Sequence, residues 1–373
     1  MSTRAALFLL ALIGLAAVAG PAYALPESST TLLSRPSGFG PLALGGVNDS
    51  WIGTDVGLQY ATDRSVSSTG RYVAFVSKAD GLSAEDDNRL INVYRRDLVT
   101  GTTDLISRAS GATGAAADRD SRSPSISADG MRVAFVSTAS NLATVANAAD
   151  QIYVRNLTTN TTTLVSRADG AAGANGSGFS DQPAISGDGT RVAYDTTSLN
   201  LDAADTNSRS DVYVRVLATN DTILASRATG AAGAVGDNYS TDAVINSDGT
   251  QVAFETDATN LAAADTNASR DIYRRDLTGN ATALISRAPG VSGAVGNSFS
   301  YDATINGDGT RIAFQSAATN LQAADTDTDR DVYMRDTATA TTALISRADG
   351  ATGANADSTT FDPSIDAAGD TVA

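Results

Sequence analysis

Apolar and polar segments alternate along the chain with a period of about 60 residues. The period is marked by glycines that follow a short polar turn, and successive glycines stand 60, 59, 60, 60 and 60 residues apart. These glycines are Gly70, Gly130, Gly189, Gly249, Gly309 and Gly369. A regular period of this length is typical of stacked or circular arrays in which one supersecondary unit repeats.

Each unit predicts four short strands. In the second repeat we expect them at residues 123–127, 132–137, 151–156 and 162–166, where Val, Ile, Tyr, Phe and Thr are enriched between turn residues. Asp129-Gly130 predicts the hairpin turn between the first two strands, because glycine accepts the positive φ that such turns require. The runs VAFVS and IYV are almost continuously apolar, which is typical of strands covered on both faces.

Units of four antiparallel strands, each covered by a neighbour on either side, are the blades of a β-propeller. We therefore predict an all-β fold, a six-bladed β-propeller whose last blade is incomplete in this chain. A sandwich or a β-helix is the alternative, but neither explains a four-strand unit at this period. The predicted blades cover about 60–108, 122–167, 181–227, 241–287 and 301–347, with a sixth split between 29–35 and 361–373. On this count about 30 further residues would close the ring.

Residues 1–24 predict a secretory signal peptide. Arg4 precedes an apolar run from Ala5 to Ala19, and Ala22-Tyr23-Ala24 has the small-x-small pattern of a cleavage site. The run is shorter than the roughly 18–20 residues that a membrane span needs. We expect residues 25–373 to form the mature propeller, periplasmic or secreted, without membrane insertion after cleavage.

Composition excludes most kinds of catalytic site. The chain has no His and no Cys, which excludes a Ser-His-Asp triad, thiol nucleophiles and the common zinc sites. Lys+Arg total 26 against 42 Asp+Glu, a formal charge of -16, and Lys78 is the single lysine. Because this balance repels phosphate backbones and anionic lipids, we expect no nucleic-acid partner.

The segments SPSISADGMRVAFVS, IYVRNL and TTLVSR together resemble the blade repeat of TolB-like, WD-like propellers, in the long-repeat form of secreted bacterial proteins. The resemblance extends over nearly all of residues 29–373, and it implies the propeller fold. TolB is a periplasmic partner protein of the Tol-Pal envelope system, so the resemblance implies protein binding rather than catalysis. The α/β domain of that family, and the Trp and Pro of its turn motif, have no counterpart in this sequence, so the Tol-Pal role is not carried over.

Residues that recur in every blade are expected to be architectural. One such set is the third-strand tyrosines Tyr94, Tyr153, Tyr213, Tyr273 and Tyr333. A second set is formed by the arginines Arg96, Arg155, Arg215, Arg275 and Arg335. We expect these arginines to pair with strand-end acids such as Asp276 and Asp336, in ion pairs that are worth little at a surface.

Acidic residues begin several of the predicted first strands. They are Asp63, Asp242, Asp302 and Asp362, while Ser123 and Gln182 stand at the same place in two blades. Since innermost strands line the channel of a propeller, these carboxylates are expected at its mouth, either to bind a cation or a basic peptide or simply as a solvated rim. Trp51, on a segment inserted into the first repeat, is a second candidate for partner binding, or a plug of the blade seam.

The loops between the second and third strands contain a candidate calcium site. They carry Asp205, Asn207 and Asp211; Asp265, Asn267 and Asp271; and Asp325, Asp327, Asp329 and Asp331. Oxygen side chains at alternate positions can surround calcium. None of the loops has the Gly or Glu of an EF-hand, and Asp and Asn also form turns of their own with the backbone. No other cofactor is expected.

Together these patterns predict a non-catalytic scaffold that binds an envelope or extracellular protein or glycan. The alternative is a propeller that serves as accessory domain of a hydrolase, such as a peptidase, whose catalytic domain lies beyond residue 373. A carboxylate-based glycosidase would need two acids in distinct environments. The near-symmetric acids of this repeat give no reason for their pKa values to diverge.

Overall fold

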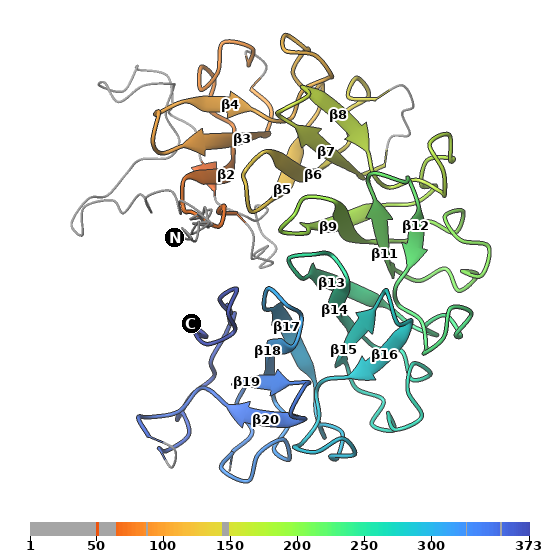
Figure 1. The fold of residues 1–373 in the computed structure, drawn as a ribbon, viewed down its shortest axis with the longest axis vertical. Coiled ribbons are helices and arrows are strands. Elements are labelled where there is room, and N and C mark those ends of the chain that lie inside the picture. Colours follow the sequence, from red (N-terminus) through yellow and green to blue (C-terminus); the bar gives the residue numbers. More distant parts are fainter. Residues whose placement is uncertain (1–49, 52–64, 87–88, 144–148, 326, 351–352) are drawn as a thin grey trace, which may run out of the picture.

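The computed structural model describes residues 50–51, 65–86, 89–143, 149–325, 327–350 and 353–373. Within these ranges the strands form five four-stranded antiparallel sheets, and each strand pairs with the next one along the chain. The described sheets are arranged around a centre in a ring that is open between the first and fifth blades, with β5, β9, β13 and β17 nearest the centre (Figure 1). The chain is thus a β-propeller, which confirms the predicted fold class. No helix in the described part of the chain is long and apolar enough to cross a membrane.

The strands of the first two blades are β1 (Ser50–Trp51), β2 (Tyr72–Ser77), β3 (Asn92–Asp97), β4 (Thr103–Leu105), β5 (Ser121–Ile126), β6 (Arg132–Ser137), β7 (Gln151–Asn156) and β8 (Thr161–Leu164). The third and fourth blades contain β9 (Ser180–Ile185), β10 (Arg191–Thr196), β11 (Asp211–Val216), β12 (Thr222–Leu224), β13 (Ser240–Ile245), β14 (Gln251–Thr256), β15 (Asp271–Asp276) and β16 (Ala281–Leu284). The fifth contains β17 (Ser300–Ile305), β18 (Arg311–Ser316), β19 (Asp331–Asp336) and β20 (Thr341–Leu344). The predicted signal peptide and the strand at 29–35 lie outside the described residues.

The innermost strands contain a bulge that shifts their start relative to the prediction. β6 and β7 begin and end where the sequence predicts, but β5 begins two residues earlier, at Ser121. At Ser123 the backbone φ is +50°, and the pairing with β6 shifts register between Arg122 and Ser125. An extra residue of this kind is a β-bulge. The same positive φ recurs at Gln182, Asp242, Asp302 and Asp362.

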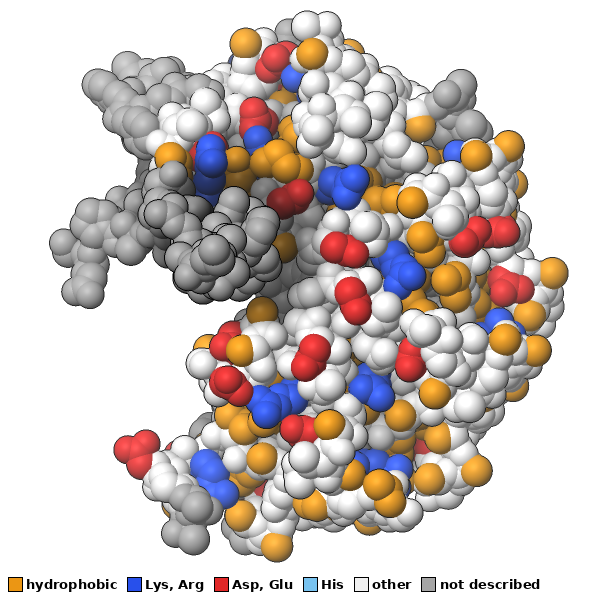
Figure 2. Space-filling view, in the orientation of Figure 1, with side chains coloured by type: hydrophobic (Ala, Val, Ile, Leu, Met, Phe, Trp, Pro, Cys, Tyr) orange, Lys and Arg blue, Asp and Glu red, His pale blue; other side chains and the backbone are white. Residues whose placement is uncertain are grey.

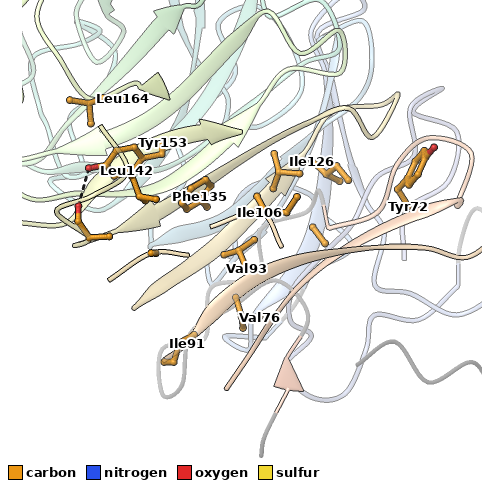
Figure 3. Close-up of a cluster of buried hydrophobic side chains, with 14 residues drawn as sticks. Tyr72, Val76, Ile91, Val93, Ile106, Ile126, Phe135, Leu142, Tyr153 and Leu164 are labelled. Carbon is orange, nitrogen blue, oxygen red and sulfur yellow. Dashed lines mark hydrogen bonds between the residues drawn. The ribbon is translucent and has the colours of Figure 1, made fainter. Parts of the chain in front are cut away.

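Apolar clusters fill the seams between adjacent blades. Figure 3 shows the cluster between the first two blades, in which Val76 and Val93 lie in one core with Ile126 and Phe135. Each third-strand tyrosine also stacks on an aromatic ring of the second strand, with ring centroids 5.6 to 6.3 Å apart. Both faces of a blade are therefore covered, which explains the continuous apolar runs, and the architectural role of the tyrosines is confirmed.

The repeated arginines join neighbouring blades through backbone carbonyls. Arg215 donates from Nη1 to the carbonyl of Ala168 and from Nη2 to that of Gly170, each at 3.0 Å. These carbonyls lie in the loop that leaves the preceding blade, and Arg275 repeats the contacts with the carbonyls of Ala228 and Gly230. Burial lowers the pKa of Arg215, while the planar guanidinium offers several fixed donors to these acceptors.

The expectation that these arginines pair with strand-end acids was wrong. Asp276 instead accepts hydrogen bonds from the backbone N–H groups of Thr278 and Gly279, at 2.8 and 2.9 Å. Asp336 does the same with Ala338 and Thr339. The acids close the hairpin turn after the third strand, because a short carboxylate readily accepts from the backbone two and three residues later.

Residues 363–373 form a hairpin that begins a sixth unit. Ile365 bridges to Val372, as Ile126 pairs with Val133 in the second blade. The carbonyl of Ala367 accepts from the N–H of Gly307 at 2.9 Å. The hairpin therefore contacts the fifth blade in the same way that each complete blade contacts the one before it.

The first blade differs from the others at its inner edge. Ser50 and Trp51 pair with Ser77 and Val76 of β2, in the register that Ser121 and Arg122 hold against β6. Trp51 thus lies in a short strand at the inner edge of the first blade, and its role in partner binding or as a plug of the blade seam stays a prediction. The end of β2 presents backbone groups that need hydrogen-bond partners, and Ser50 and Trp51 supply them.

Candidate binding site at two blade seams

Two kinds of loop meet on one face of the propeller. The first residue of each innermost strand donates its backbone N–H to the loop that precedes the third strand of the previous blade. The N–H of Ser240 donates to the carbonyl of Ser210 at 2.8 Å, and the N–H of Ser300 donates to the carbonyl of Arg270 at 2.9 Å. Residues of consecutive repeats are therefore held side by side at every seam. In Figure 2, acidic and basic side chains are interspersed around the inner side of the ring, on the face in view.

Two of the predicted channel acids, Asp242 and Asp302, occupy the bulges of β13 and β17, but they are not equivalent. Asp242 lines a cavity of about 260 Å³ together with Gln182, Val244 and Ile305, whereas Asp302 does not line it. The backbone N–H of Asp242 donates to Oε1 of Gln182 in the preceding blade, at 3.1 Å.

The other two channel acids add less to this arrangement. Asp362 is exposed and is not among the residues that line the cavity. Asp63 lies outside the described residues, as does the side chain of Trp51.

Two further acids, which the sequence analysis missed, lie beside these bulges. Oε1 of Glu255, on β14, accepts a hydrogen bond from the backbone N–H of Asp302 at 2.6 Å. Asp195, on β10, is buried close enough to Asp242 for the charge of Asp242 to raise the pKa of Asp195. Asp195 and Asp242 mark the seam between the third and fourth blades, and Glu255 and Asp302 the seam between the fourth and fifth. We call these two pairs the acidic seams.

Each acidic seam joins a buried carboxyl to a partly exposed one. Asp195 is 8% exposed and Glu255 2%, while Asp242 and Asp302 are half-buried. Oδ2 of Asp195 accepts from the hydroxyl of Ser210 at 3.1 Å, and its Oδ1 has no hydrogen-bond partner among the described residues. A partly exposed carboxyl can contact a ligand directly, whereas the buried carboxyl behind it is out of a ligand's reach.

Burial and mutual repulsion raise the pKa values of these acids. Burial raises the pKa of Asp195 and of Glu255 well above the usual range, and the neighbouring Asp242 adds to both shifts. Burial, with the charges of Asp362 and Asp242, raises the pKa of Asp302 to about 6. The expectation that the near-symmetric acids have no reason to differ in pKa was wrong, because their neighbours differ. Burial raises the pKa of Asp242 while Thr241, Arg270 and Gln182 lower it, whereas the charges of Asp362 and Asp242 add to the effect of burial on the pKa of Asp302.

Basic side chains compensate this charge only in part. Arg270 lies 3.4 Å from Oε2 of Glu255 and 2.9 Å from Oδ2 of Asp257. Among the described residues it makes the single ion pair within 4 Å of an acidic-seam carboxylate. An arrangement with more carboxyls than cations favours the approach of a positively charged ligand.

A row of exposed aromatic rings lies next to the acidic seams. Phe179, Tyr239 and Phe299 immediately precede β9, β13 and β17, and they are 63%, 42% and 48% exposed. We call these three residues the aromatic row. Asp120 takes this position in the second blade. The sequence analysis missed the row, although aligning the repeats position by position would have shown it.

Phe299 belongs to a cluster of aromatic and arginine side chains. It stacks on Tyr301 with a centroid distance of 6.1 Å, and Arg270 and Arg330 lie 6.0 and 5.8 Å from the Tyr301 centroid. Aromatic and Arg side chains are the residue types most enriched at the energetic centres of protein interfaces.

The candidate calcium loops of the third and fourth blades form closed hydrogen-bond networks. In the third blade, Nδ2 of Asn207 donates to Asp211 at 2.9 Å and to the carbonyl of Gly236 at 2.6 Å. The hydroxyl of Tyr213 donates to Asp205 at 2.8 Å. The fourth blade repeats these contacts with Asp265, Asn267 and Asp271. Here an amide nitrogen, and not a third oxygen, faces the carboxylate.

The loop of the fifth blade differs from these two. Carboxylate oxygens of Asp325, Asp327 and Asp331 all lie within 4.8 Å of one another. Nδ2 of Asn355 donates to Asp327 and Asp331, at 3.1 Å each, while Asp329 is exposed outside the cluster. Of the ten predicted ligands the structure thus gathers three as carboxylates in one place, and calcium binding there stays a prediction.

Comparison with known proteins gives similarity in fold alone. No protein-family model and no curated protein matches the chain in sequence. TolB from Acinetobacter baumannii is similar to it over 84% of this chain, with 17% identity and a TM-score of 0.43. An oligogalacturonate lyase in complex with manganese is similar over 87% of this chain and 76% of its own, with 12% identity and a TM-score of 0.47. The chain covers 58% of the length of that TolB.

Proposed function

We propose that this protein is a non-catalytic scaffold of the cell envelope or extracellular space, and that it binds a basic segment of a partner protein at the acidic seams. One observation carries the proposal: four carboxyl groups at two adjacent seams have a single ion pair among the described residues. A basic side chain that contacts Asp242 and Asp302 would offset the remaining charge. The formal charge of -16 would also speed the approach of such a partner.

Binding fits these acids better than catalysis does. The two acids with the most strongly raised pKa values, Asp195 and Glu255, are buried, and both oxygens of Glu255 contact this chain's own groups. A general acid must come within hydrogen-bond reach of the substrate. We therefore assign the ligand contacts to the half-buried Asp242 and Asp302, with Glu255 holding the backbone N–H of Asp302 in place.

A fluorescent octa-arginine peptide is a direct probe of this proposal. We expect it to bind at low salt, to bind less tightly as salt rises, and to bind at least about 10-fold less tightly to the Asp242→Asn/Asp302→Asn variant. The control variant Asp221→Asn/Asp349→Asn changes the net charge equally at two exposed acids, and we expect it to change affinity less than about 2-fold. Equal losses in the two variants would mean that net charge, and not the seams, attracts the peptide.

The pH dependence gives a second test of the same site. Because the pKa of Asp302 is about 6, this carboxyl gains its charge as the pH rises from 5 to 7.5. Octa-arginine should therefore bind more tightly at pH 7.5 than at pH 5 in the wild type, and this gain should shrink in Asp302→Asn. An unchanged pH profile in that variant would contradict a role for Asp302.

A further inference from the structure

We infer that the exposed ring of Phe179 receives an arginine side chain of the partner protein, stacked on the ring and facing the carboxylate of Asp181. This inference rests on the proposed function, which it deepens by naming a contact and its chemistry. It is carried by the repeat itself, since the next blade shows an arginine of this chain in the equivalent place.

In the next blade, the equivalent aromatic ring already has an arginine of this chain over it. Arg209, two residues before β11, stands over the ring of Tyr239 with its Cζ 4.8 Å from the ring centroid. Its Nη1 also donates to the Tyr239 hydroxyl at 2.8 Å. A guanidinium over an aromatic face is attracted by the quadrupole of the ring. The second member of the aromatic row therefore already has a cation.

The equivalent place over Phe179 has no cation from the described part of the chain. Phe179 is 63% exposed and stands at the position of Tyr239, 60 residues earlier. The position of Arg209 is taken by Ala149, two residues before β7. The methyl side chain of Ala149 carries no charge and is too short to cover the ring of Phe179. The repeat thus presents an exposed ring at three seams: Tyr239 lies under Arg209, Phe299 stacks on Tyr301, and Phe179 has neither kind of neighbour among the described residues.

The charges near Phe179 favour a cation as the occupant. Asp181, two residues along, is 38% exposed at its side chain and lies 2.9 Å from Nη2 of Arg122. The same guanidinium pairs with Asp150 at 2.9 Å. Two carboxylates therefore share one arginine at this seam. A second guanidinium, placed over Phe179, would contact an aromatic face and a carboxylate that is still partly open to solvent.

A glycan is the competing occupant, because a sugar ring can also stack on an exposed aromatic side chain. The hydroxyls of a neutral sugar could donate hydrogen bonds to Asp150 and Asp181, but a sugar brings no opposite charge to them. An arginine gains from both the ring and the charge, so the observations favour a protein partner.

Three substitutions at this place separate its chemistry from simple hydrophobic contact. Phe179→Leu keeps an apolar side chain but removes the π face, and we expect octa-arginine to bind about 2- to 5-fold less tightly. Phe179→Trp offers a stronger π face and should bind at least as tightly as the wild type. Ala149→Arg supplies the guanidinium that Arg209 supplies one blade later, and it should compete with the peptide and weaken binding. Melting temperatures of the three variants should stay close to the wild type, because Phe179 is exposed and Ala149 is partly exposed.

The outcomes distinguish this inference from the proposed function. If octa-arginine binding depends on Asp242 and Asp302 but Phe179→Leu and Ala149→Arg bind like the wild type, the inference is overturned and the proposed function stands. If octa-arginine does not bind the wild type at all, the proposed function fails and the inference fails with it. If cellohexaose or chitohexaose binds instead, and Phe179→Leu abolishes that binding, the ring is a glycan contact and the inference is wrong.

Discussion

The first two blades and the next three have the same four-stranded fold, but their side chains differ in charge and aromatic character at the same few repeat positions. The fifth residue of the second strand is Val76 and Val136 in the first pair, and Asp195, Glu255 and Gln315 in the other three. The first residue of the third strand is Asn92 and Gln151, against Asp211, Asp271 and Asp331. The residue before the innermost strand is Asp120 in the second blade, against Phe179, Tyr239 and Phe299.

This contrast separates what the repeat needs in order to fold from what it adds. Stacked aromatic pairs and the blade-joining arginines recur in both groups, and they hold the ring together. Among the described residues, the acids at these two strand positions and the aromatic row belong to the third to fifth blades, while Phe361 adds one more exposed ring beyond the fifth blade. Since a fold does not by itself determine a function, a site is best sought where one part of a symmetric ring departs from the common pattern.

Moving an acid from one group of blades to the other should have the largest effect on stability. Val136 is fully buried in an apolar cluster with Val154 and Tyr194. Val136→Asp would place a carboxyl opposite Arg122, which already pairs with two other carboxylates. We expect a loss of about 3–5 kcal/mol in the free energy of unfolding at pH 8, measured by urea denaturation.

The reverse substitution, Asp195→Val, is the matched control. It removes a buried acid whose charged form is disfavoured, so we expect it to change stability by less than about 1 kcal/mol or to increase it. If Val136→Asp were tolerated as well as the natural Asp195, the two groups of blades would not differ in the way proposed.

Neutralising the third-strand acids should flatten the pH dependence of stability. Burial raises the pKa of Asp211 and of Asp271 to about 7, so between pH 4 and 7 the folded state binds more protons than the unfolded state. These groups therefore contribute stability that is fully present below about pH 4 and is lost as the pH rises through 7. Asp211→Asn/Asp271→Asn, which imitates Asn92, should be about 1–2 kcal/mol more stable at pH 8 and nearly unchanged at pH 5. A variant that is less stable at both pH values would contradict this assignment.

The arginine at the boundary between the two groups should affect stability less and binding in the opposite direction. Arg122 pairs with Asp150 of the second blade and Asp181 of the third. Because these side chains are partly exposed, Arg122→Met should cost only about 1 kcal/mol. It should also leave more negative charge at the seam, so octa-arginine should bind about 2- to 3-fold more tightly. Weaker binding would show that Arg122 itself belongs to the contact surface.

Calcium should have the smallest effect. If the fifth-blade cluster binds calcium with the millimolar affinity of extracellular modules, 5 mM calcium should raise the melting temperature by about 1–3 °C over a chelator control. Asp327→Asn restores the residue that the third and fourth blades carry at this place, and it should remove the increase. An equal increase in that variant would place the ion elsewhere.

Most of the architecture could be predicted from the sequence. β6 and β7 begin and end where expected, because continuous apolar runs and the Asp129-Gly130 turn define them. The start of β5 was missed by two residues, since the bulge at Ser123 breaks the alternation that marks a strand. The partners of Arg215 were also missed, because they are backbone carbonyls of another blade and have no signal in the residue types.

The candidate site was predicted only in part. Asp242 and Asp302 were found because each opens a predicted strand with an acid. Asp195 and Glu255 were missed, since each stands inside an otherwise apolar run where period and composition predict only a core strand. The aromatic row was missed for a related reason: one exposed ring is unremarkable, and only its recurrence at one repeat position gives it meaning.

The most direct test of the central claim is amide hydrogen exchange of the wild-type protein with and without octa-arginine. The account predicts slower exchange around residues 178–182, 238–242 and 298–302 when the peptide is bound, and little change around residues 119–123 of the second blade. Equal protection in all blades, or protection confined to the first two, would contradict the claim that binding belongs to the third, fourth and fifth blades.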